Sequence, residues 1–285
     1  MQNEQIKIAF FGNSVFSLIV LKELKNLGIF PDVLVTSPDK PQGRKMILTP
    51  STTKVWAEEN SIEYLTPTKL GEPEFIKKIS NYNLFIVASY GKIIPKEILE
   101  IPKFKTINIH PSLLPKYRGP SPLQQQILDG EKEVGVTIMQ IDEQVDHGPI
   151  IIQKEIQLED FLGFNDLQEK LAKEGSILLA DVLPLWIKGK IKPTEQNHTE
   201  ATFTKKETKE DGLINMINDD QLKNYLKILA FEHWPVAYFE MEKDGKKIKV
   251  IVKKATFKEN ELEILRVLPE GKKEMSYADF LRGLK

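Results

Sequence analysis

The first half of the chain alternates between short apolar runs and longer segments with apolar residues at helical spacing. Runs of strand length lie at 6–11, 32–37, 83–91 and 105–112. Segments with a helical pattern lie between or after them, at 14–28, 50–61, 72–80 and 121–130. Strands that alternate with helices along a chain build a parallel sheet covered by helices on both faces. We therefore expect an α/β fold with a Rossmann-like, mostly parallel sheet in the N-terminal domain.

After this region the pattern changes. Residues 133–141 and 148–158 predict a pair of strands around a loop, and residues 164–189 predict one long helix. Residues 190–211 are polar and lack periodic apolar positions, which is typical of a linker. Residues 212–285 predict a small second domain with one helix and several short strands. The predicted organisation is a domain at 1–189, a linker at 190–211 and a second domain at 212–285.

Composition excludes several classes of protein. The 285 residues carry a net charge of −1, so the chain as a whole is not a broadly basic nucleic-acid binder. It has no cysteine, which excludes a disulfide scaffold, a thiolate zinc site and a cysteine nucleophile. The N-terminus lacks a signal-peptide pattern, and no apolar stretch is long enough to span a bilayer. We expect a soluble, cytoplasmic protein without a membrane partner. No set of His, Asp and Glu has metal-ligand spacing, so we expect no metal.

The turn after the first predicted strand, "FFGNSVFS", is a candidate phosphate loop. It has one glycine, Gly12, where the dinucleotide fingerprint needs three. We therefore favour a tight turn in which Asn13 or Ser14 caps the following helix.

Asn108 and His110 lie two residues apart near the end of the strand predicted at 105–112. Residues at this spacing point to the same face of a sheet, and the carboxyl ends of parallel strands are where such sheets bind ligands. An Asn side chain can donate a hydrogen bond to an oxyanion, and a His can accept a proton near neutral pH. The pair is suited to acyl transfer, although an isolated His near a strand end is more often structural.

A carboxylate that orients the imidazole would complete such a site. Asp146, in the loop between the two strands predicted after residue 130, is the best candidate, and the alternative is an ordinary turn-forming Asp. His147 could be functional instead, but its position beside a turn glycine predicts an exposed side chain.

Two segments concentrate positive charge. In 36–45, two prolines and a glycine predict a loop rather than a helix or strand, either simply solvated or suited to a polyanionic substrate. Its cations are Lys40, Arg44 and Lys45. Residues 243–258 contain seven lysines and one acid, and the alternation of the segment predicts an exposed lysine face on a strand. The lysines singled out there are Lys247, Lys249 and Lys253. Protection of an edge strand and contact with phosphates explain them equally well.

Four motifs stand out together: "NIHPSLLPKYRGPSP" at 108–122, the "DHG" that contains Asp146, "VASYGKIIP" at 87–95 and "TSPDKPQGRK" at 36–45. In combination they resemble the 10-formyltetrahydrofolate-dependent formyltransferases. The resemblance continues in the second domain through "EATFTKKETKEDGLIN", "HWPVAYFE" and "LPEGKKEMSYADFLRG", and so covers nearly the whole chain.

The resemblance implies that a formyl group passes from 10-formyltetrahydrofolate to the free amino group of initiator methionyl-tRNA, for translation initiation. It places Asn108, His110 and Asp146 as the catalytic trio and implies direct attack by the amine. It assigns folate contact to Ser112, Leu113, Leu114, Pro115, Tyr90, Gly91 and Ile93. It assigns tRNA contact to Lys40, Arg44 and Lys45, and it implies an OB-like β-barrel in the second domain that contacts the tRNA through its own lysines. We expect a monomer.

Two departures from the family pattern stand out. The basic loop continues as "GRKMILTPS" where relatives carry another Gly and Lys, and the tail from 246 to 271 is shortened, as if a hairpin of the barrel were missing. Three other functions use related sequences: an N-formyltransferase acting on an amino-sugar nucleotide, a formyltetrahydrofolate hydrolase, and a tRNA-binding relative without catalysis. The second-domain motifs count against the first, and the intact trio counts against the third. The hydrolase shares the trio but usually has other attached domains.

Overall fold

The computed structural model of the chain describes residues 6–43, 45–243 and 245–284. The chain forms two compact units. The first consists of Met1–Gly119, Gly135–Ile156 and Gln168–Phe203. The second consists of Pro120–Val134, Gln157–Leu167 and Thr204–Lys285, so it takes in two stretches that precede the predicted linker.

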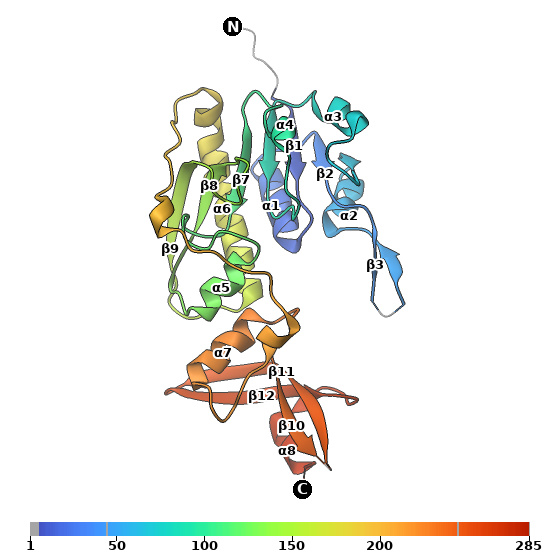
Figure 1. The fold of residues 1–285 in the computed structure, drawn as a ribbon, viewed down its shortest axis with the longest axis vertical. Coiled ribbons are helices and arrows are strands. Elements are labelled where there is room, and N and C mark those ends of the chain that lie inside the picture. Colours follow the sequence, from blue (N-terminus) through green and yellow to red (C-terminus); the bar gives the residue numbers. More distant parts are fainter. Residues whose placement is uncertain (1–5, 44, 244, 285) are drawn as a thin grey trace. The chain divides into compact units, whose positions relative to one another are not determined.

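A seven-stranded sheet with the order β5-β2-β1-β6-β7-β8-β9 organises the N-terminal half of the chain (Figure 1). Its strands are β1 (Ile8–Phe11), β2 (Val33–Val35), β5 (Glu63–Leu65), β6 (Leu84–Val87), β7 (Thr106–His110), β8 (Glu133–Gln140) and β9 (Ile150–Gln157). The pairs from β5 through β7 are parallel, and β8 runs antiparallel to β7. The mostly parallel, Rossmann-like sheet expected from the alternating pattern is therefore confirmed.

Helices cover both faces of this sheet. They are α1 (Val15–Asn26), α2 (Thr52–Glu59), α3 (Pro73–Ile79), α4 (Lys96–Leu99) and α6 (Phe164–Ile187). On one face, Phe75 of α3 and Ile98 of α4 are buried in a cluster with Phe11 and Phe85 of the central strands. On the opposite face, α6 approaches so closely that a Cβ on Gly175 would lie 2.6 Å from Ile109. The two faces of the sheet therefore have different neighbours, and Ile109 of β7 lies on the face that α6 covers.

The turn after β1 joins the carboxyl ends of three strands. A Cβ on Gly12 would lie 2.6 Å from the Cβ of Ser17, so the turn requires glycine. Ser14 caps α1 in a capping box with Ser17, as the sequence predicts. The Asn13 side chain accepts hydrogen bonds from the residues that follow β2 and donates one to the carbonyl of Tyr90, which follows β6. The Asn13 side chain is thus engaged in hydrogen bonds within the protein, at the point where the strand order reverses.

The segment at 36–45 is not the plain loop that its prolines and glycine predict. Strands β3 (Lys40–Gln42) and β4 (Ile47–Thr49) pair in an antiparallel hairpin, with Pro41 opposite Leu48. The prediction was wrong because a two-stranded ribbon leaves one edge of each strand unpaired, and proline is tolerated at such an edge.

The second unit contains a four-stranded antiparallel sheet in the order β10-β11-β12-β13. Its strands are β10 (Tyr238–Lys243), β11 (Lys246–Lys258), β12 (Glu261–Pro269) and β13 (Met275–Ser276). Its helices are α5 (Pro122–Leu128), α7 (Gln221–Ala230) and α8 (Tyr277–Arg282). An OB fold has five strands, so four strands with a two-residue β13 agree with the shortened tail noted in the sequence. Within the described ranges, no helix has the length and apolar character needed to cross a membrane.

Candidate active site

Asn108 and His110 project from the same face of β7. Because side chains alternate along a strand, this face is the one opposite Ile109 and therefore opposite α6. Asn108 pairs in register with Val87 of β6, whose side chain belongs to the buried cluster on this face. The sequence prediction that the two side chains share a face at the end of β7 agrees with this register.

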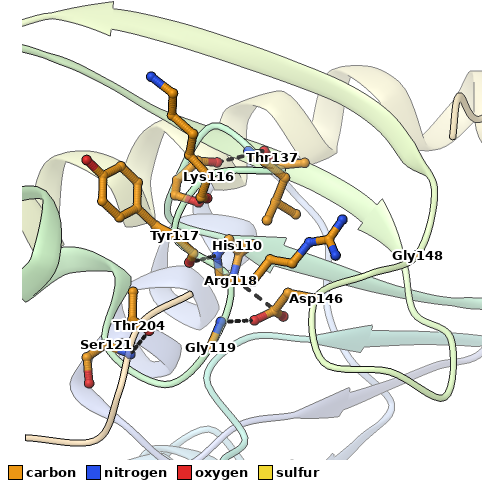
Figure 2. Close-up of polar contacts among 12 residues, drawn as sticks. His110, Lys116, Tyr117, Arg118, Gly119, Ser121, Thr137, Asp146, Gly148 and Thr204 are labelled. Carbon is orange, nitrogen blue, oxygen red and sulfur yellow. Dashed lines mark hydrogen bonds and ion pairs between the residues drawn. The ribbon is translucent and has the colours of Figure 1, made fainter. Parts of the chain in front are cut away.

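His110 is 4% exposed and is held from two sides (Figure 2). Its Nε2 atom lies 3.0 Å from the carbonyl oxygen of Tyr117. A carbonyl oxygen only accepts hydrogen bonds, so Nε2 carries the proton of this bond. The Nδ1 atom lies 3.6 Å from Oδ1 of Asp146. The ring therefore presents Nδ1 to a carboxylate.

The Asp146 carboxylate is anchored at its second oxygen. Oδ2 accepts a hydrogen bond of 2.8 Å from the backbone N–H of Gly119, as Figure 2 shows. The residue has φ +49°, a left-handed conformation that is uncommon outside glycine. Two residues on, a Cβ at Gly148 would lie 2.1 Å from the carbonyl oxygen of Gln140, so the loop closes tightly on β8. This closure brings Asp146 back to His110.

Asn108 is half-buried, and its carboxamide makes no hydrogen bond to any residue that the structure describes. An uncharged N–H donor that is not already engaged can stabilise a developing oxyanion at little reorganisation cost. Asn108 is thus chemically suited to that role on the same face as His110.

Three residues that the sequence analysis gave no role complete the surroundings. Arg118 is 3% exposed, and burial lowers the pKa of its guanidinium while the carboxylates of Asp146 and Asp142 oppose that shift. It donates to the side chain of Gln196, which is buried, and to Nδ1 of His198. Gln196 and His198 lie in the segment predicted as a linker. A buried, charged side chain needs partners. Arg118, in the "KYRGP" motif, was therefore the one sequence feature that could have indicated that further polar residues pack here.

The segment predicted to contact folate is fixed by its own hydrogen bonds. Ser112 is fully buried, and its hydroxyl donates to the carbonyl of Lys116. The backbone of Leu114 donates to the hydroxyl of Thr137 and accepts from the side chain of Gln153. Leu113 packs over Gly135, where a Cβ would lie 2.4 Å from it. The loop is therefore rigid before any ligand binds.

The second predicted folate segment is divided between core and surface. Tyr90 is 2% exposed and packs edge-on against Phe11, and burial raises the pKa of its phenol to about 12. Among the described residues its hydroxyl has no hydrogen-bond partner. Gly91 has φ +74° and is exposed, and the Ile93 side chain is 79% exposed. Of the three, Ile93 presents apolar surface to solvent.

His147 was predicted to be exposed, but it is half-buried. Its ring stacks on that of His198 with centroids 4.0 Å apart, and its Nδ1 lies 2.6 Å from a carboxylate oxygen of Asp142. The prediction rested on the neighbouring turn glycine. It was wrong because the stacking partner, His198, comes from a distant part of the sequence. Within residues 6–43, 45–243 and 245–284, no three His, Asp or Glu side chains gather in the manner of a metal site.

The predicted tRNA-contacting cations have different surroundings. Lys40 and Lys45 are exposed on the β3–β4 hairpin, whereas Arg44 lies outside the described residues. On β11, Lys247 and Lys253 are exposed, and Lys249 lies 3.5 Å above the ring of Tyr238. Burial lowers the pKa of Lys249, with nearby Lys209 contributing in the same direction.

Strand β11 lies between β10 and β12 in the order of the sheet. It pairs with β10 only from Lys246 to Ile251 and with β12 only from Val250 to Lys258, so Lys247 and Lys253 each lie on a stretch that is paired on one side. The alternation expected along it also breaks at a bulge between Val252 and Lys254.

Comparison with known proteins adds the family. Residues 6–183 match the model of the formyl transferase family. Methionyl-tRNA formyltransferases of Bacillus thuringiensis (strain Al Hakam) and Bacillus anthracis (strain A0248) are each 36% identical over 303 residues, covering 98% of this chain and 96% of the relative.

Solved structures share the fold. Methionyl-tRNA formyltransferase from Clostridium thermocellum superposes with a TM-score of 0.62 at 19% identity, over 93% of this chain and 99% of that one. An N-formyltransferase from Helicobacter canadensis, in complex with folinic acid and dTDP-3-aminofucose, gives a TM-score of 0.63 at 21% identity and covers 89% of each chain. The chain therefore belongs to the formyl transferase family as a formyl-transferring enzyme, and nearly its whole length aligns with methionyl-tRNA formyltransferases of that family.

Proposed function

We propose that this enzyme transfers the formyl group of 10-formyltetrahydrofolate to the amino group of initiator methionyl-tRNA, with Asn108, His110 and Asp146 as the catalytic residues. The observation that carries the proposal is the pairing of His110 with Asp146 beside the unengaged carboxamide of Asn108. The trio supplies a proton acceptor, a carboxylate and an oxyanion donor on one face of one sheet.

The reaction proceeds by direct attack of the acceptor amine on the formyl carbon. A bond forms between the amine nitrogen and the formyl carbon. The formyl oxygen becomes an oxyanion, which the Asn108 amide stabilises. Nδ1 of His110 takes the proton that the amine loses, because Nε2 is already committed to the Tyr117 carbonyl. The resulting imidazolium is stabilised by Asp146. When the bond from the formyl carbon to N10 of the folate breaks, the proton passes to N10 and tetrahydrofolate leaves.

The folate lies against the two segments predicted for it. The segment Ser112–Pro115 offers a rigid wall because its polar groups are satisfied internally. Ile93 offers an exposed apolar side chain, suited to the flat pteridine ring. Preformed surfaces of this kind bind without a cost of ordering.

The acceptor assignment rests on the chain beyond the matched domain. Relatives named as methionyl-tRNA formyltransferases match 98% of this chain, including the second unit. Exposed cations are suited to contact with a phosphate backbone. On the hairpin these are Lys40 and Lys45, and on β11 they are Lys247 and Lys253.

The test measures transfer of radiolabelled formyl from 10-formyltetrahydrofolate to two acceptors under identical conditions. We expect methionyl-tRNA to be formylated and a dTDP-linked amino sugar to give only background. Transfer to the sugar with none to the tRNA would overturn the acceptor assignment. If neither acceptor is formylated and formate is released, the result would indicate a hydrolase.

A further inference from the structure

The segment from Thr194 to Phe203 lies within the predicted linker, yet it is bonded into the first unit at several points. Thr194 exchanges two backbone hydrogen bonds of 2.8 Å with Ile150. The carbonyl of Thr202 accepts from the backbone N–H of Arg118, and the N–H of Thr202 donates to the carbonyl of Pro115. These bonds connect the segment to the start of β9 and to the loop after β7, on both sides of the candidate active site.

Gln196 is the buried residue of this segment, at 5% exposure, and both ends of its carboxamide are engaged. Nε2 donates to the carbonyls of Asp146, at 2.9 Å, and Gly148, at 2.7 Å. Oε1 accepts from Nε and Nη2 of Arg118, at 3.1 and 2.6 Å. A carboxamide with two donors and one acceptor atom fits this position, because carbonyls lie on one side and a guanidinium on the other.

The two residues that hold His110 share an unusual feature. Tyr117, whose carbonyl accepts from His110, has φ +62°, and Asp146 has φ +49°. Left-handed conformations cost free energy in residues other than glycine and persist only where the surroundings impose them. The same segment supplies a restraint to each: the Thr202 hydroxyl accepts from the N–H of Tyr117 at 2.8 Å, and Gln196 donates to the carbonyl of Asp146.

We propose that Gln196 is a positioning residue of the formyl transfer reaction, acting through Asp146. This inference rests on the proposed function. It assigns to Gln196 no contact with substrate. By holding the carbonyls on either side of His147, Gln196 fixes the loop that directs the Asp146 carboxylate at His110.

Two variants separate this role from general stabilisation. Gln196→Ala removes all four hydrogen bonds, whereas Gln196→Glu keeps an acceptor for Arg118 but replaces the donor to the two carbonyls by a repelling carboxylate. We expect both to lower kcat by about 10–10²-fold with KM for each substrate changed less than about twofold, as displacement of a catalytic group by about 1 Å does. The matched control is Asn197→Ala, because Asn197 is exposed and, among the described residues, its side chain bonds only to Thr199 and Glu200. It should keep wild-type kcat.

The deciding measurements are a double-mutant cycle and the hydrogen exchange of the Gly119 amide. If Gln196 acts through Asp146, the Asp146→Asn/Gln196→Ala double variant is no slower than Asp146→Asn alone. The Gly119 N–H, which donates to Asp146, should exchange about tenfold faster in Gln196→Ala and unchanged in Asn197→Ala. Additive losses in kcat, or unchanged exchange at Gly119, would overturn the inference. Full activity of Asp146→Asn would instead contradict the proposed function, while the exchange measurement would still decide whether Gln196 holds the loop.

Discussion

The Nε2 atom of His110 donates a hydrogen bond to the carbonyl oxygen of Tyr117 across 3.0 Å. This bond leaves Nδ1 as the ring nitrogen that can accept a proton, because the donor nitrogen already carries one. Nδ1 faces Asp146 at 3.6 Å, a separation longer than a direct hydrogen bond. In the proposed mechanism Nδ1 is the base, and the Asp146 carboxylate lies beside it.

Asp146→Asn tests the carboxylate itself. An amide keeps the size of the side chain and can still accept from Gly119, but it cannot stabilise an imidazolium. We expect kcat to fall by roughly 10²–10³-fold, as for loss of a general base, with the fold retained. Steady-state kinetics with unchanged circular dichroism would verify this, and wild-type kcat would reduce Asp146 to a turn residue.

Tyr90→Phe tests the buried hydroxyl. The Tyr90 phenol has no hydrogen-bond partner among the described residues, so its removal should leave the free enzyme as stable or up to about 1 kcal/mol more stable at neutral pH. Its pKa is raised from 10.0 to about 12, so between these values the unfolded state releases a proton that the folded state keeps. Stability contributed by the neutral phenol is therefore lost as pH rises from about 10 towards 12. Urea unfolding at pH 7 and pH 11 should show wild type losing more stability than Tyr90→Phe, and equal losses would contradict this.

Gly148→Ala tests the closure of the Asp146 loop. The new Cβ would lie 2.1 Å from the Gln140 carbonyl oxygen, a backbone atom that cannot move without disturbing β8. We expect a loss of roughly 1–3 kcal/mol of stability, as overpacking typically causes, together with a reduced kcat. Gly71→Ala is the control, because a Cβ there meets no atom within 4 Å and φ is not positive. Similar unfolding midpoints for the two variants would contradict the argument.

The β11 lysines test the second unit's contact with tRNA. Lys247 and Lys253 are exposed, whereas Lys249 packs over Tyr238, so the first two are the candidates for phosphate contact. Replacing both by Gln should lower the slope of log affinity against log salt by about 0.7–0.9 for each phosphate that is no longer neutralised. Lys173→Gln on α6, where Lys173 pairs with Glu169, serves as the control. Unchanged salt dependence in the double variant would remove β11 from the tRNA-binding surface.

Arg44 tests the basic segment at 36–45. Its replacement by Gln should reduce turnover with methionyl-tRNA more than it reduces binding of tRNA in general, since this segment follows β2 in the sequence and the carboxyl ends of parallel strands are where such sheets bind ligands. Lys45→Gln, next to it, provides the comparison. Filter binding and initial rates on the same tRNA preparation would check this, and a parallel loss of both quantities would contradict it.

Features carried by local pattern were predictable from the sequence. The strand–helix alternation predicted the parallel sheet, and the two-residue spacing of Asn108 and His110 placed both side chains on one face. Asp146 was predicted to lie beside His110 because an imidazole base needs a carboxylate to orient it, and its Oδ1 lies 3.6 Å from Nδ1 of His110. The first two predictions rest on patterns within a few neighbouring residues.

Features that depend on distant contacts were not predictable in this way. Gln196 lies in a polar stretch without periodicity, and only the fold brings it to Asp146, fifty residues earlier. The stacking of His147 on His198 likewise depends on a partner remote in sequence. Proline in the β3–β4 hairpin misled for a related reason, since tolerance of proline depends on which strand edge is free.

The central claim is that Asn108 and His110 perform the chemical step of formyl transfer to methionyl-tRNA. Single-turnover transfer of labelled formyl, with enzyme in excess over methionyl-tRNA and saturating 10-formyltetrahydrofolate, isolates that step from substrate binding and product release. For Asn108→Ala and His110→Ala, each folded as wild type, we predict a rate constant lower by roughly 10²–10³-fold. A rate constant within about twofold of wild type in either variant would contradict the account.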